Sequence, residues 1–148
     1  MKKIFIHASA DVQTSDIGSG TKIWQKCVVL LGARIGEDNN ICAGSFIEGG
    51  ATLGHRVTIK NGVQVWSGVK MGDDVFVGPN VSFTNDRSPR SKMHGTPMTT
   101  EVQNGESVGP GAVMLPGLVL GAGAVVTKDV PPNSTVVGNP ARLVLHDE

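Results

Sequence analysis

A spacing of six residues between large apolar side chains is the feature that most constrains how this chain can fold. These ladder positions are Ile17, Ile23, Val29, Ile35, Ile41, Ile47, Leu53, Ile59, Val65, Met71, Val77 and Phe83. Because residues of these types make up roughly 0.3 of the chain, such an unbroken run has a chance probability on the order of one in a million. A period of six does not fit an α-helical face. It therefore predicts a short strand and a tight corner in each repeat.

Two further patterns share this register. The fourth residue after each ladder position from Ile17 to Val77 is small or β-branched, which gives a second track: Thr21, Cys27, Ala33, Asn39, Ser45, Ala51, Val57, Val63, Val69, Val75 and Val81. Gly18, Gly36, Gly54 and Gly72 each follow a ladder position and are spaced 18 residues apart. Three hexapeptides therefore make one turn of a triangular prism of stacked parallel strands. We expect the ladder side chains to form the whole core, and the small residues and glycines to turn the chain at the corners.

The ladder is interrupted once. Residues 84–101 are polar, contain two prolines and have no apolar period, so we predict an excursion loop, and long loops on a rigid scaffold are often functional. The ladder resumes at Val102, Val108, Met114, Leu120 and Val126. The tail, residues 131–148, does not continue it cleanly and is expected to cap the solenoid. We expect residues 1–148 to form a single domain.

Charge and hydropathy exclude several classes of function. Thirteen basic and thirteen acidic side chains cancel, so the composition favours neither nucleic acid nor an anionic membrane as a partner. No apolar run approaches the roughly 18 residues of a membrane span, and the N-terminal residues lack the apolar segment of a secretory signal. We therefore expect a cytoplasmic protein without a membrane partner.

Several segments resemble a known enzyme family. The Gly-Ala-Gly-Ala-Val-Val-Thr-Lys-Asp-Val-Pro run at 121–131 and the Val-Gly-Asn-Pro-Ala-Arg run at 137–142 resemble the acetyl-CoA end of the hexapeptide-repeat acyltransferases. The segment 75–86, which ends Ser-Phe-Thr-Asn-Asp, and Ile23-Trp24-Gln25 resemble the bacterial N-acetyltransferases that act on dTDP-3-amino-3,6-dideoxyhexoses. The resemblance implies an all-β, left-handed parallel β-helix. It also implies acetyl-CoA as co-substrate, a nucleotide-sugar substrate for cell-surface polysaccharide, and a homotrimer with active sites between subunits.

The resemblance also implies a set of coenzyme-binding residues. The glycine-rich corners offer exposed backbone that could hold the pantetheine arm, and cations near the C-terminus could bind the phosphates of coenzyme A. The candidates are Gly111, Ala112, Gly123, Ala124, Lys128 and Arg142.

The candidate acceptor residues lie mostly where the loop leaves the scaffold. Asn85 and Asp86 are expected to contact the amino sugar, and Asp86 is the best carboxylate to take a proton. An alternative is that the leaving thiolate of coenzyme A takes the proton itself. His94, within the loop, is a further candidate base.

Three more residues complete the predicted acceptor site. Trp66 follows a ladder position directly, so its side chain points outward and could stack on a base or sugar, or fill a subunit interface. Asn61 and Arg90 are the other predicted substrate-binding residues.

Other functions stay open from sequence alone. The four histidines, His7, His55, His94 and His146, are too scattered for a metal site, so we expect none. An O-acetyltransferase acting on a small sugar or serine shares the fold, but an alcohol needs a histidine base more than an amine does. A catalytically silent β-helix protein is the third possibility, and failure to bind coenzyme A would favour it.

Overall fold

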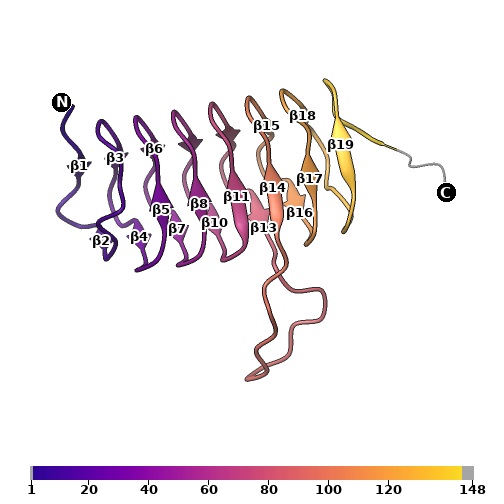
Figure 1. Ribbon diagram of the computed structural model, residues 1–148, viewed down its shortest axis with the longest axis horizontal. Helices are drawn as coiled ribbons and strands as arrows, with labels where there is room; N and C mark the ends of the chain where they lie inside the picture. The colour runs from indigo at the N-terminus through magenta and orange to yellow at the C-terminus, as the bar shows by residue number, and fades with distance from the viewer. Residues whose placement is uncertain (1, 145–148) are drawn as a thin grey trace.

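The protein is an all-β solenoid in a computed structural model that describes residues 2–144. Figure 1 shows the coils stacked side by side in one column, with β1 and β19 at opposite ends and one long loop projecting from the column. Within residues 2–144 there is no helix that is long and apolar enough to cross a membrane. The last four residues of the predicted tail, which include His146, lie outside the described residues.

Three sheets form the sides of the solenoid. Sheet A contains β1 (Phe5–Ile6), β3 (Lys22–Ile23), β6 (Asn40–Ile41), β9 (Thr58–Ile59), β12 (Phe76–Val77), β15 (Ser107–Val108) and β18 (Val125–Val126). Sheet B contains β2 (Asp11–Val12), β4 (Val28–Val29), β7 (Phe46–Ile47), β10 (Gln64–Val65), β13 (Ser82–Phe83) and β16 (Val113–Met114). Sheet C contains β5 (Arg34–Ile35), β8 (Thr52–Leu53), β11 (Val69–Met71), β14 (Thr100–Val102), β17 (Val119–Leu120), β19 (Thr135–Val137) and β20 (Arg142–Leu143).

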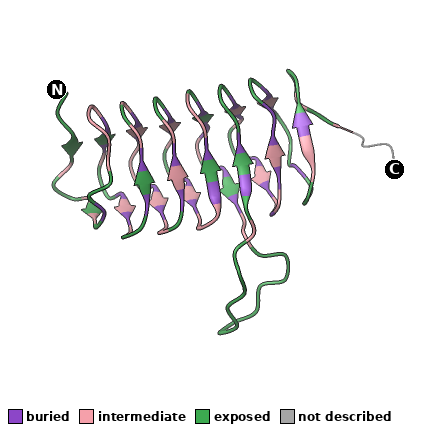
Figure 2. Cartoon of the chain, viewed as in Figure 1, coloured by how far each residue is buried: buried purple, intermediate pink, exposed green. Residues whose placement is uncertain are grey.

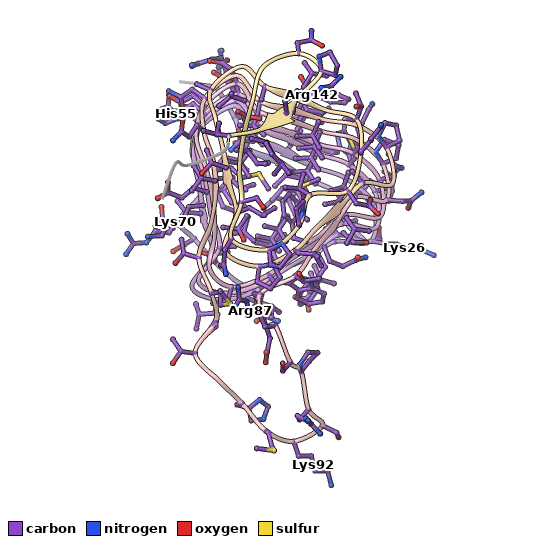
Figure 3. The ribbon with its side chains drawn as sticks, turned by 90° about the vertical axis from the view of Figure 1, so that its right-hand side faces the viewer. Lys26, His55, Lys70, Arg87, Lys92 and Arg142 are labelled. Carbon is purple, nitrogen blue, oxygen red and sulfur yellow. The ribbon has the colours of Figure 1, made fainter. Side chains whose placement is uncertain are left out.

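The strands pair in parallel with the register that three hexapeptides per turn predict. Ile23 lies opposite Ile41, and Ile41 lies opposite Ile59, so partners on one side are 18 residues apart. The coil is left-handed. Seen from the C-terminal end in Figure 3, the corner of Lys26 lies on the right, the loop with Arg87 below, and Lys70 and His55 on the left. The chain therefore runs clockwise as it advances toward the viewer.

Both apolar tracks of the sequence are inside the solenoid. In the strands from β3 to β13 the ladder residue is buried, and Figure 2 shows buried segments, in purple, that recur from coil to coil. Second-track residues such as Cys27, Ala33 and Val57 are also fully buried. The expectation that the ladder alone forms the core is therefore wrong. A two-residue strand brings only one side chain inward, and the residue that follows each corner fills the remaining volume.

The corners need two different kinds of residue. We name them corner 1, from sheet A to sheet B, corner 2, from B to C, and corner 3, from C to A. The third residue after each ladder position from Ile17 to Val77 has a positive φ, and several of these residues are glycines. Gly18, Gly36, Gly54 and Gly72 lie at corner 3 but do not have a positive φ. They are needed because a Cβ there would meet the next coil, its backbone at the first three glycines and the Asn104 side chain at Gly72. The expectation that these four glycines turn the chain is therefore wrong, because they allow close contact between coils instead.

The loop departs slightly from its predicted bounds, and the tail adds two strands to sheet C. β14 begins at Thr100, so the excursion covers residues 84–99 rather than 84–101. Thr100 pairs with Val69 and is fully buried, which draws the end of the loop into sheet C. In the tail, β19 adds a parallel strand next to β17, and β20 pairs with it in antiparallel orientation. The antiparallel strand covers an edge that would otherwise be left open.

Candidate active site

The excursion loop is closed at its neck and turned at its tip by backbone hydrogen bonds. Met98 N–H donates to the carbonyl oxygen of Asn85 at 2.9 Å, which joins the two sides of the neck. At the tip, Met93 N–H donates to the carbonyl oxygen of Arg90 at 3.2 Å, and Lys92 has a φ of 60°. Figure 3 shows the loop extending away from the solenoid, with Lys92 near its far end.

A polar pocket of about 230 Å³ lies where the loop meets corner 2. Its lining residues come from two coils and the loop: Glu48, Ser67, Asn85, Asp86, Met93, His94, Gly95, Thr96 and Pro97. Two carboxylates and one imidazole are present, and neither lysine nor arginine is among these lining residues. We call this the loop pocket. It unites all three predicted catalytic residues, Asn85, Asp86 and His94.

Side chains from successive coils bind the backbone of Ser67 from both sides. Ser67 N–H donates to Glu48 Oε2 at 2.7 Å, and Asn85 Nδ2 donates to the Ser67 carbonyl oxygen at 3.0 Å. Glu48 lies one coil before Ser67, and Asn85 lies one coil after it. These bonds hold the wall of the loop pocket in place. The amide nitrogen of Asn85 is therefore bound to the solenoid backbone.

Asp86 has one oxygen in a local turn. Ser88 N–H donates to Asp86 Oδ1 at 2.8 Å, which is the Asx-turn geometry that an Asp at the start of a loop often adopts. The side chain is exposed, as is that of His94. The turn fixes the direction of the carboxylate and is compatible with a role for Oδ2 in binding an acceptor.

The predicted substrate-binding residues lie at different places. Trp66 is half-buried and directly precedes Ser67 at corner 2, and its ring lies 5.5 Å from that of Phe46 on the preceding coil. Arg90 is exposed in the loop tip. Asn61 is exposed at corner 1, on the far side of sheet B from the loop. Within one chain, Trp66 is therefore next to the loop pocket, whereas Asn61 is not.

A second, larger pocket lies at the C-terminal end of the solenoid. Its volume is about 440 Å³, and it is lined by Val126, Thr127, Lys128, Asp129, Val130, Pro131, Val136, Ala141, Arg142 and Leu143. Its lining combines buried valines with Lys128 and Arg142, the two cations predicted to bind phosphates. Apolar surface beside two cations suits a ligand that joins an alkyl arm to phosphate groups. We call this the C-terminal pocket.

The structure separates the four small residues predicted to hold the pantetheine arm. Gly111 and Ala112 lie at corner 1, one coil before Lys128, whereas Gly123 and Ala124 lie at corner 3. The corners at Gly111 and Gly123 face open space, and both glycines have a positive φ. Ala112 and Ala124 are buried, and the N–H groups of all four residues donate to backbone oxygens inside the chain. Of these four residues, only Gly111 and Gly123 therefore present exposed backbone to a ligand.

Sequence reasoning missed Glu48 and Ser67, although the repeat contains the signal that finds them. Glu48 follows the ladder position Ile47 directly, just as Trp66 follows Val65 and the loop follows Phe83. With 18 residues per turn, these positions stack on one corner. Among residues 2–144 there is no group of three or more His, Cys, Asp or Glu side chains that could hold a metal ion.

Comparison with known proteins relates the chain to acetyltransferases. No protein-family model matches it. Serine acetyltransferase from Bacillus pumilus is 32% identical over 127 residues, which cover 84% of this chain and 58% of that protein. Serine acetyltransferase from Mycobacterium tuberculosis is 32% identical over 130 residues, covering 82% and 55% respectively. Galactoside O-acetyltransferase from Escherichia coli is 34% identical over 89 residues, covering 51% and 43%.

A solved structure agrees with this relation at the level of the fold. The acetyltransferase domain of PglB from Neisseria gonorrhoeae superposes with a TM-score of 0.51 at 19% identity, covering 96% of this chain and 58% of that one. The chain thus spans about half the length of the curated relatives it matches. Its fold and its relatives make it a β-solenoid protein related to the hexapeptide-repeat acyltransferases.

Proposed function

We propose that the protein is an acetyl-CoA-dependent N-acetyltransferase. Its acceptor would be the amino group of a nucleotide-linked amino sugar of the dTDP-3-amino-3,6-dideoxyhexose type, used for cell-surface polysaccharide. The observation that carries this proposal is the loop pocket, where two carboxylates lie without a lysine or arginine in the lining. A pocket of this charge favours a cationic acceptor, and an amine is cationic near neutral pH. The acetyltransferase relatives support the acetyl donor.

The donor is assigned to the C-terminal pocket. Its valines would pack against the pantetheine arm, while Lys128 and Arg142 would bind phosphate oxygens. The loop pocket lies at corner 2 and the C-terminal pocket at the last coil, so one chain keeps the two apart. A homotrimer that places the loop of one subunit against the next subunit would bring acceptor and donor together. The proposal therefore includes an active site between subunits.

The chemistry requires an amine nitrogen with a free electron pair. The bound ammonium loses a proton to Asp86, and the nitrogen then attacks the thioester carbon. As the carbon–nitrogen bond forms, the carbonyl oxygen becomes negative and needs a hydrogen-bond donor. The carbon–sulfur bond then breaks, the amide remains, and the thiolate takes the second proton from nitrogen. The sum is one acetamide, one free thiol and one proton, which Asp86 releases to solvent.

O-acetyl transfer is the second candidate, and one specific observation favours it. His94 lines the loop pocket, where it could remove the proton from a hydroxyl group. The galactoside O-acetyltransferase among the relatives carries out transfer to oxygen. The two candidates predict different acceptors for the same pocket.

A thiol-release assay tests the proposal directly. The protein is mixed with acetyl-CoA, and free thiol is followed after adding dTDP-3-amino-3,6-dideoxygalactose, its gluco epimer, serine or a galactoside. Release that depends on the amino sugars supports N-acetyl transfer. Release with serine or the galactoside alone would establish the second candidate. A folded protein that binds no coenzyme A in calorimetry would argue for a silent solenoid.

Replacing Asp86 by Asn tests its role as proton acceptor. Asparagine can still accept the Ser88 N–H bond through its amide oxygen, so the loop should keep its shape. We expect kcat to fall about 100-fold, in the range of side-chain acid–base catalysis, with the KM for acetyl-CoA unchanged. Near-normal turnover would show instead that no side-chain base is needed, because the amine loses one proton to solvent before it binds and the leaving thiolate takes the other.

Replacing Lys128 by Ala tests the donor site. Because the side chain is exposed, its contact with a phosphate is screened by water and salt. We expect the KM for acetyl-CoA to rise about 3- to 10-fold at low salt, with a smaller effect at high salt. Initial rates at two ionic strengths measure this. An unchanged KM at low salt would remove Lys128 from the donor site.

A further inference from the structure

Glu48 is a carboxylate in the loop pocket with no function in the scheme above. It lies at corner 2, directly after β7, and reaches past its own coil to accept the Ser67 N–H bond through Oε2 at 2.7 Å. The side chain is half-buried, and it lines the loop pocket together with residues supplied by the loop. This contact uses one carboxylate oxygen and fixes the direction of the other.

The charge of the loop pocket gives this carboxylate a role. Its ionisable side chains are Glu48, Asp86 and His94. Asp86 is attached to the loop, whereas Glu48 is attached to the scaffold, so the two carboxylates approach the pocket from different elements. A single ammonium group has three donors and can bind two carboxylates at once. Hydrogen bonds between charged groups are stronger than neutral ones, and this favours the charged amine over a hydroxyl group.

We propose that Glu48 binds the ammonium group of the acceptor and selects amines over alcohols. The inference rests on the proposed N-acetyltransferase function and adds a scaffold residue to its acceptor site. Asp86 accepts the proton that frees the nitrogen, while the Glu48 carboxylate binds the amine and holds it in place. Closing the loop over the pocket is not required, because Glu48 and Ser67 are both part of the rigid solenoid.

Glu48→Gln is a sharp test, because the glutamine oxygen can still accept the Ser67 N–H bond. The substitution removes the charge and keeps the hydrogen bond that shapes the pocket wall. We expect the KM for the amino-sugar acceptor to rise about 10- to 100-fold at pH 7, with kcat changed less than about threefold. The KM for acetyl-CoA should stay constant. Asp86→Asn has the opposite pattern, with the main loss in kcat.

The pH dependence separates charge recognition from a structural effect. Glu48 acts on the charged amine, so the deficit of Glu48→Gln should shrink as the pH rises and the free amine predominates in solution. Glu48→Asp keeps the charge on a shorter side chain, and its acceptor KM should lie between those of the wild type and Glu48→Gln. Glu37→Gln is the matched control, because Glu37 is exposed at corner 3, away from the loop.

The outcomes distinguish this proposal from the proposed function. An active wild type whose Glu48→Gln variant has the acceptor KM of Glu37→Gln would overturn the role of Glu48 and leave N-acetyl transfer intact. A deficit that is equal at all pH values and equal for both substrates, with a lower melting temperature, would show a purely structural role. A folded wild type that acetylates only alcohols would overturn both proposals together.

Discussion

Gly36→Ala is expected to destabilise the protein by about 3 to 5 kcal/mol, although the change adds one methyl group. A Cβ at Gly36 would meet the carbonyl oxygen of Gly54 and would lie 2.7 Å from its carbonyl carbon. Both atoms belong to the backbone of the next coil, which cannot move aside as a flexible side chain would. The coils must therefore separate at corner 3.

Separation at this corner also breaks two hydrogen bonds of the buried Asn39 side chain, those to Gly54 and Val57 of the next coil, whereas its bond to Gly36 lies within its own coil. Asn39 Nδ2 donates to the carbonyl oxygens of Gly36, at 3.2 Å, and Gly54, at 2.9 Å. Its Oδ1 accepts from Val57 N–H. Each bond that is lost inside the solenoid costs about 1 kcal/mol, and overpacking of a dense interior adds about 1 to 3 kcal/mol. This sum is the origin of the expected loss.

Gly44→Ala is the matched control for Gly36→Ala. Gly44 lies at corner 1 with a φ of 74°, and an added Cβ would meet no atom within 4 Å. Alanine there incurs only the cost of a left-handed backbone, about 1 to 2 kcal/mol. Urea denaturation of both variants, followed by circular dichroism, measures the difference. If both variants lose the same free energy of unfolding, close contact between coils is not the reason why position 36 requires a glycine.

The period of six predicted the sides of the solenoid because burial leaves a regular trace in the sequence. Ile23, Ile41 and Ile59 lie opposite one another on sheet A as the 18-residue turn requires. The same pattern could not distinguish a glycine that allows positive φ from one that allows close approach. Both require the absence of a side chain, and only the stacked coils show that Gly36 meets Gly54.

The candidate site was only partly predictable, for a related reason. Asn85, Asp86 and His94 stand close together in an irregular segment, so the sequence could place them in one loop pocket. Glu48 reaches that pocket from another coil, and only the 18-residue repeat, which stacks it on the same corner as Trp66 and the loop, marks it. Gly111 and Gly123 lie in similar glycine-rich segments, but they occupy different corners because 12 residues are two thirds of a turn. Two glycines in similar sequence motifs therefore need not lie close together in the folded chain.

Glu106 leads to the second large prediction, because it is an acidic residue inside the solenoid. It occupies the second track at corner 3, where other coils have Thr21, Asn39 or Val57, and it is 0% exposed. Oε1 accepts the Ala124 N–H bond at 3.3 Å, whereas Oε2 has no partner among the described residues. Burial raises the pKa of Glu106 to about 7, and the bond from Ala124 offsets only part of this effect.

The raised pKa means that folding favours the protonated form of Glu106. Its ordinary pKa is 4.5, so between pH 4.5 and about 7 the folded chain binds more protons than the unfolded chain. The free energy of unfolding therefore decreases as the pH rises through this window. A difference of about 2.5 pKa units, at 1.36 kcal/mol per unit, corresponds to about 3 kcal/mol. This contribution is complete below pH 4.5 and lost above pH 7.

Glu106→Gln should remove this pH dependence, because glutamine stays neutral and has nearly the same shape. At pH 8 we expect the variant to be more stable than the wild type by about 2 to 3 kcal/mol, whereas at pH 4.5 the two should agree within about 1 kcal/mol. Urea denaturation at both pH values measures the effect. The quantity that isolates Glu106 is the difference in the free energy of unfolding between variant and wild type, because every other titrating group contributes to both. Glu101→Gln, at an exposed position on β14, is the control for a neutralised surface carboxylate. If Glu106→Gln differs from the wild type by the same amount at both pH values, the buried carboxyl is not the group that titrates, and Oε2 must find a partner or water that keeps it ionised.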